Sequence, residues 1–397
     1  MAQVVRPQRA PLYQRVRWYH LVVPLALAFL PAVLWNLAEQ PRAVRLEGER
    51  WVPDTGRYAG AEACRPCHGA IVEAQLAGSH ARTLRDLSRE KPRGDFQQPK
   101  DVVDPFTGAR YRVRKQGGSH EITINSRGME ANQKIHYEFG SGVHAFGYLG
   151  KIDEKTWLDA RLNYYPKVGW DFTSGQDQPH TYLLEQPLGK PLNGDAVLRC
   201  FSCHSTVVRA DGVGKSPPDG SGLRVRPDKS VLGITCESCH GPQAEHARNP
   251  RPKALGGLGE DWSARNMNRI CGRCHGISNI SPSHPVIARF QPWGLEQSRC
   301  FQESDGKLSC TSCHDPHHDA RRDEAFYVAR CQSCHTGSAG ATAKTVCKIN
   351  RRTGCVTCHM PRDTRSMLHV SLTDHRIRVV KGGGAQPSPH PASTESH

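Results

Sequence analysis

The chain has 397 residues, a length that could hold about two or three domains, and a formal net charge of +15. Only 37% of its residues are hydrophobic, which is low for a soluble chain of this size, so an ordinary side-chain core does not account for the whole length. The positive charge alone suggests nucleic-acid binding, an interpretation that the motifs described below do not support.

The N-terminal region predicts a membrane anchor. Residues 1–17 contain four arginines and no acid, and residues 18–38 carry no charge. The uncharged stretch is long enough to cross a bilayer as a helix, and its basic flank should stay cytoplasmic. The alternative is a cleaved signal peptide, but the apolar run is long and no small-residue cleavage site follows it. We therefore expect a single-pass anchor in the inner membrane, followed by a polar linker over residues 39–58.

The motif Cys-x-x-Cys-His occurs seven times, once alone and then six times between residues 200 and 359. It is the attachment motif of a c-type haem. Two thiols three positions apart lie on one face of a helical turn, and each can form a thioether bond to the porphyrin. The adjacent His then becomes an axial ligand of the haem iron. We predict seven covalently bound haem c groups at sites 1 to 7, in chain order. The cysteines are Cys64 and Cys67, Cys200 and Cys203, Cys236 and Cys239, Cys271 and Cys274, Cys310 and Cys313, Cys331 and Cys334, and Cys355 and Cys358; the histidines are His68, His204, His240, His275, His314, His335 and His359.

Paired cysteines could instead bind zinc, but zinc does not require a His directly after the second Cys. Histidine fills 21 of 397 positions, so seven such placements by chance have odds on the order of one in a billion. A structural disulfide framework fails the same test. Covalent haem and the high cysteine content both indicate a compartment outside the cytosol, here the periplasm.

Seven haems also account for the composition. Large apolar macrocycles can supply the core that side chains normally supply. Each haem carries two propionates, so seven bring about 14 negative charges, which nearly cancel the +15. Many arginines and lysines are then expected to pair with propionates, and no nucleic-acid partner is expected.

Between sites 1 and 2 the pattern predicts one helix and then a small antiparallel β insertion at about residues 106–166. The helix spans 70–84 and contains His80, which is a candidate distal ligand. Which iron His80 binds stays open. His144 follows the third strand in a Gly-rich segment and is either a ligand or a packed polar group. The predicted strands are 111–115, with a Gly117-Gly118 turn after it, 121–125, 135–139, 145–152 and 157–162.

Further candidate distal ligands follow later motifs. His246 comes after a Gly-Pro turn that brings it close to a haem. His317 and His318 are too near site 5 to reach its far face, so we expect one of them to reach a neighbouring haem. His369 and His375 lie downstream of site 7. His180 and His284 are weaker candidates.

The first cysteines of sites 2 to 7 follow one another at intervals of 21 to 39 residues. So little chain between haems forces the macrocycles into near contact, which permits rapid electron hopping. Residues 379–397 have the composition of a disordered tail.

Several of these segments together resemble a known group, the multihaem c-type cytochromes related to cytochrome c-554, hydroxylamine oxidoreductase and pentahaem nitrite reductase. The likeness covers about residues 58–378. The matching segments are Tyr58 to His68 with His80, Phe139 to Tyr148, Cys236 to His246, Arg289 to Cys300, Cys310 to His317 and Cys355 to Pro361.

The resemblance implies closely stacked and perpendicular haem pairs, a periplasmic electron-transfer role and a disulfide between Cys300 and Cys347. Two departures weaken the enzymatic members of the group as models. The nitrite reductases of this group usually have a Lys in place of the His in one catalytic motif, and no Cys-x-x-Cys-Lys motif occurs here. Hydroxylamine oxidoreductases usually have eight haems, whereas seven motifs are present here.

We therefore expect a mainly α and irregular multihaem cytochrome c fold over residues 59–378, with short helices and loops wrapped around seven stacked haems. The function expected is electron relay between a quinol-linked membrane partner, or other cytochromes, and a periplasmic acceptor or donor. The alternative is an oxidoreductase that acts on a small nitrogen or sulfur compound at a five-coordinate haem, for which the isolated site 1 is the first place to look.

Overall fold

The computed structural model describes residues 57–97, 101–140, 142–176, 187–212, 222–250, 263–276, 288–335, 347 and 353–380. The predicted basic segment and anchor, most of the predicted linker and nearly all of the predicted tail lie outside these residues. Within the described ranges no helix is long and apolar enough to span a bilayer.

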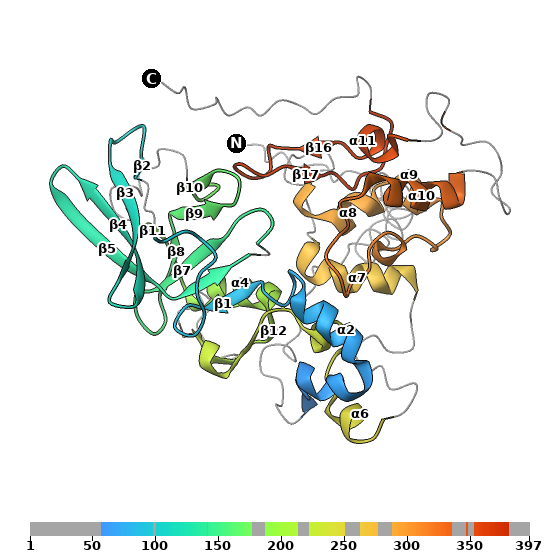
Figure 1. Ribbon diagram of the computed structural model, residues 1–397, viewed down its shortest axis with the longest axis horizontal. Helices are drawn as coiled ribbons and strands as arrows, with labels where there is room; N and C mark the ends of the chain where they lie inside the picture. The colour runs from blue at the N-terminus through green and yellow to red at the C-terminus, as the bar shows by residue number, and fades with distance from the viewer. Residues whose placement is uncertain are drawn as a thin grey trace, which may run out of the picture. The chain divides into compact units, whose positions relative to one another are not determined.

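A four-stranded antiparallel sheet follows site 1 (Figure 1). Along β3, buried Tyr111 and Val113 alternate with exposed arginines, the period of two that a half-buried strand requires. Gly117 and Gly118 both have positive φ and close the hairpin between β3 and β4, which confirms the predicted turn. The strands, in spatial order, are β2 (Val102–Val103), β3 (Arg110–Gln116), β4 (Ser119–Ser126) and β5 (Met129–Ile135).

A second, five-stranded sheet makes the β region larger than the sequence suggested. It runs from residue 84 to residue 192 rather than over 106–166 only. Its edge strands read Leu-Arg-Asp and Gly-Lys-Pro-Leu, which show no strand period and extend only because they pair with β6 and β8. The strands, in spatial order, are β1 (Leu84–Asp86), β6 (Tyr137–Phe139), β7 (Gly147–Lys151), β8 (Trp157–Ala160) and β11 (Gly189–Leu192); β9 (Leu162–Tyr165) and β10 (Gly169–Phe172) form a separate hairpin.

The β region has an aromatic core of its own. Tyr137, Trp157 and Phe201 are buried and contact one another with ring centroids 5.5–5.8 Å apart. Phe201 lies on α4 (Gly194–His204), the helix that ends in motif 2. Aromatic burial of this kind stabilises a fold strongly, so here side chains supply the core that we had assigned to haem.

The motifs of all seven sites begin in short helices; Figure 1 labels α4, α7, α10 and α11 among them. Between and beside them lie short two-stranded ribbons. The helices are η3 (Ala61–Cys64), α2 (Arg65–Ala77), α4, α5 (Cys236–His240), α6 (Ala244–Arg248), α7 (Ala264–His275), α8 (Gln291–Glu296), α9 (Arg299–Gln302), η6 (Cys310–Ser312), α10 (Glu324–His335) and α11 (Cys355–His359), with η4 at Pro227–Lys229; the ribbon strands are β12 (Ser205–Val207), β13 (Ala210–Asp211), β14 (Arg224–Val225), β15 (Val231–Leu232), β16 (Arg362–Asp363) and β17 (Leu372–Thr373).

The predicted helix over 70–84 was wrong at both ends. Helix α2 starts inside motif 1 and ends at Ala77, because Gly78 takes an extended backbone. His80 therefore lies in the turn after the helix, and Leu84 already belongs to β1.

Candidate functional site

Helix ends position five of the motif histidines. Helices α4, α5, α7, α10 and α11 each end at the His of a motif. In α4 and α7 the first turn is capped by a side chain, since Asn193 accepts from the Ala196 amide and Ser263 from the Asn266 amide. In α4, α5, α7, α10 and α11 the two cysteines of the motif, three positions apart, lie on one helix face.

Four motif histidines each face a histidine from another part of the chain. In each pair the ring centroids are 6.1–6.5 Å apart. The most regular pair, His240 with His317, has ring planes only 3° from parallel at 6.2 Å. The pairs are His68 with His246 (6.5 Å), His240 with His317, His275 with His80 (6.1 Å) and His314 with His375 (6.1 Å).

The spacing fits one metal ion between the two rings of each pair. A metal–imidazole bond is about 2 Å, so two imidazoles on opposite faces of one ion have centroids about 6 Å apart. Such a ligand pair is what a six-coordinate haem iron requires. Within the described ranges, no group of three or more Cys, His, Asp or Glu side chains is arranged to hold a metal ion.

Hydrogen bonds orient several of these rings. The Nδ1 atoms of His204 and His359 lie 3.1 and 3.0 Å from the carbonyl oxygens of Thr83 and Arg378. His375 contacts the Thr373 carbonyl in the same way at 2.9 Å. A ring that donates Nδ1–H to a carbonyl keeps its Nε2 lone pair for a metal ion.

Burial favours the neutral form of three histidine rings at these sites. It lowers the pKa of His204 and of His275, and it lowers the pKa of His375 to about 4. Metal ligation requires the neutral ring, so the environment and the hydrogen bonds favour the same role.

Two candidate ligands have other surroundings. His369 has a positive φ, its Nε2 lies 2.6 Å from the Asp171 carboxylate, and its ring packs on Tyr165. For His144, burial and the nearby cations Arg362 and Lys167 lower the pKa. Neither is paired with a motif histidine by the contacts above. The distal ligands of sites 2, 6 and 7 stay predictions, and His180 and His284 lie outside the described residues.

Thiols from different motifs also meet. Cysteine thiols here stand for the thioether sulfurs of an attached haem. Three thiols lie close enough to a thiol of another motif for the neighbour to raise their pKa: Cys271 raises that of Cys310, and, after burial, Cys236 raises that of Cys64 and Cys355 that of Cys331. These contacts bring together sites 1 and 3, sites 4 and 5, and sites 6 and 7.

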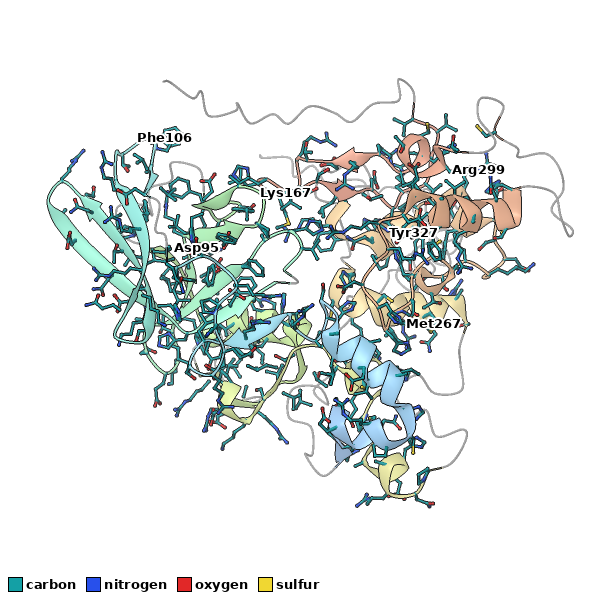
Figure 2. All side chains as sticks on the ribbon, in the orientation of Figure 1. Asp95, Phe106, Lys167, Met267, Arg299 and Tyr327 are labelled. Atoms are coloured by element: carbon teal, nitrogen blue, oxygen red, sulfur yellow. The ribbon has the colours of Figure 1, made fainter. Side chains whose placement is uncertain are left out.

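A buried amide links sites 4 and 5. The Asn268 side chain on α7 is 1% exposed, and its Oδ1 accepts from the Cys310 amide at 2.8 Å and from the Cys310 thiol at 3.1 Å. Sequence reasoning missed this residue, although a polar side chain three positions before Cys271 was a visible signal. Tyr327 lies on α10 (Figure 2). Its ring packs on His314 with ring centroids 5.6 Å apart.

The disulfide implied for Cys300 is not formed. Cys300 carries a free thiol. Burial raises its pKa, and the neighbouring Cys334 and Cys313 raise it further, so its surroundings are the motifs of sites 5 and 6.

Comparison with known proteins finds a sequence relative among the multiheme cytochromes. No family model matches the chain. Over 189 residues the chain is 25% identical to the multiheme cytochrome MtrA of Shewanella baltica (strain OS185), a match that covers 44% of this chain and 46% of that protein. The chain thus spans about half the length of the curated relative it matches. Among solved structures, the outer cell wall cytochrome OcwA is 15% identical with a TM-score of 0.46, covering 82% of this chain and 80% of that chain. The similarity to MtrA supports a multihaem c-type cytochrome.

Proposed function

We propose that this protein is a membrane-anchored c-type cytochrome with seven covalently bound haems, which relays electrons between a quinol-linked membrane partner and a periplasmic acceptor or donor. We also place it in the group of cytochrome c-554, hydroxylamine oxidoreductase and pentahaem nitrite reductase, on the motifs given above.

The observation that carries the relay is the set of four histidine pairs at 6.1–6.5 Å. Bound haem would supply reversible one-electron chemistry at each site. The chain's contribution is to hold two imidazoles facing each other at each of these four sites, which would leave no iron position for a substrate there. The thiol contacts between motifs support close neighbours for electron transfer.

Site 1 is no longer the first place to look for catalysis. His246 faces His68 there, so a second ligand is at hand. The relay predicts low-spin ferric spectra and no cyanide binding at sites 1, 3, 4 and 5. A high-spin haem that binds cyanide or nitrite at all four of these sites would contradict the relay and favour the oxidoreductase.

The membrane partner is tested with the full chain in isolated membranes. Added quinol should reduce the haems of the full-length protein. A matched variant that carries residues 39–397 behind a cleavable leader should be released from the membrane and lose quinol reduction, while dithionite still reduces it. Equal quinol reduction of both proteins would contradict the anchored partner.

A further inference from the structure

Glu237 lies between the two cysteines of motif 3 and is only 4% exposed. Its carboxylate accepts three backbone hydrogen bonds. Oε1 accepts from the Ala59 amide at 2.8 Å and from the Gln243 amide at 2.9 Å, and Oε2 accepts from the Gly60 amide at 2.9 Å. All three neighbours are N–H donors, which is what an ionised carboxylate, an acceptor only, requires.

The three donors come from the two segments that carry the ligands of site 1. Ala59 and Gly60 come directly before η3, which leads into motif 1 and His68. Gly60 has φ 81, a conformation that turns the chain there and that favours glycine. Gln243 comes directly before α6, and His246 lies on that helix. One carboxylate in motif 3 therefore holds both segments whose rings stand 6.5 Å apart.

The field of Glu237 also reaches site 1. Its negative charge is one of the causes that raise the pKa of Cys64, after burial and the Cys236 thiol. A buried charge interacts with its surroundings through a low effective dielectric constant, so its influence exceeds that of a surface carboxylate. A negative charge beside an iron stabilises the ferric over the ferrous state.

We propose that Glu237 is the positioning residue of site 1: it fixes the segments of His68 and His246 against motif 3, and its charge lowers the reduction potential there. This rests on the proposed haem function. Both parts predict measurable changes that a residue needed only for packing would not produce.

The test uses the haem-loaded full chain and compares Glu237→Ala, Glu237→Gln and His246→Ala. E237A should convert one haem per chain from low-spin to high-spin, with the same ferric spectrum as H246A, and the double variant should add no second high-spin haem. E237Q keeps an acceptor at Oε1, so it should stay low-spin, but one reduction potential should shift upward in a redox titration.

The matched control is Glu245→Gln. Glu245 lies on α6 beside His246, is exposed and forms a surface ion pair with Arg248, so this variant should change neither spectrum nor potential. The proposal is overturned if E237A keeps the wild-type low-spin spectrum, or if E237Q leaves every potential unchanged. Should E237A fail to fold, E237Q alone still decides. A wild-type protein without low-spin haem would instead contradict the proposed function and not the role of Glu237.

Discussion

His317 and His318 are chain neighbours with different surroundings. The His317 ring lies parallel to His240, the histidine of motif 3, at 6.2 Å. His318 turns its Nδ1 to the Asp315 carboxylate at 2.9 Å. From the sequence, one of the two was expected to reach a neighbouring haem, without a way to choose between them.

The pair gives a matched experiment on the ligands of site 3. His317→Ala should produce one high-spin ferric haem per chain, because site 3 loses its second imidazole, and added imidazole should restore the low-spin spectrum. His318→Ala should leave the spectrum unchanged. High-spin haem in H318A and none in H317A would reverse the assignment.

Asp159 gives a pH-dependent contribution to stability. Burial raises the pKa of this carboxyl group from 3.8 to about 6, although Lys190 on the paired strand and the Gln176 amide oppose the shift. A group whose pKa is raised on folding stabilises the fold fully below pH 3.8, and this contribution is lost as the pH rises through 6.

Asp159→Asn should therefore stabilise the protein only at higher pH. We expect a gain of about 3 kcal/mol above pH 6 and almost none below pH 4, measured as the difference in the free energy of unfolding between variant and wild type. A stability difference between variant and wild type that does not depend on pH would show that ionisation of Asp159 does not destabilise the folded protein.

At the residue scale the sequence identified the motif cysteines and histidines but could not assign partners. The pairing of His275 with His80 joins residues from opposite halves of the chain. Nor does any local pattern reveal that Asp171 engages His369, because that contact joins residues 198 positions apart. Such pairings depend on tertiary structure alone.

At the scale of elements, the turn after α2 connects two sites. Thr83 accepts from the His204 ring through its carbonyl, while its hydroxyl contacts the carbonyls of His80 and His204. Gly233, just after β15, donates to the His204 carbonyl, and the next amide donates to the His80 carbonyl. The sequence predicted a continuous helix here, because Gly78 is a weak stop signal and the tertiary contacts that form the turn are not local.

Gly233→Ala should displace this turn. Gly233 has φ +78, and a Cβ there would lie 2.0 Å from the Ala81 carbonyl oxygen. We expect a loss of about 2–4 kcal/mol in stability and an added high-spin haem, as His80 moves from His275.

Gly128→Ala is the control, because Gly128 has φ +80 with no atoms within 4 Å of an added Cβ. It carries the backbone strain alone, about 1 kcal/mol, and should leave the haem spectrum intact. If Gly233→Ala and Gly128→Ala change stability and the haem spectrum equally, close packing around Gly233 is not the cause of the effect.

At the scale of the whole molecule, neighbouring sites are not always consecutive in the chain. The thiol contacts join sites 1 and 3, whose motifs are separated by site 2. Motif spacing limits how far apart two consecutive haems can be, but it does not tell which haems are neighbours. The sequence therefore predicted close packing of the haems but not their spatial order. The strands 111–115 and 121–125 were confirmed, because their alternation is local.

All seven motifs should carry covalent haem. Intact mass spectrometry of the denatured protein, made in a host with haem-attachment machinery, counts the attached groups. We expect a single dominant mass equal to the mature chain plus seven haem c groups. A dominant mass with fewer haems, or a colourless protein that binds zinc at these cysteines, would contradict it.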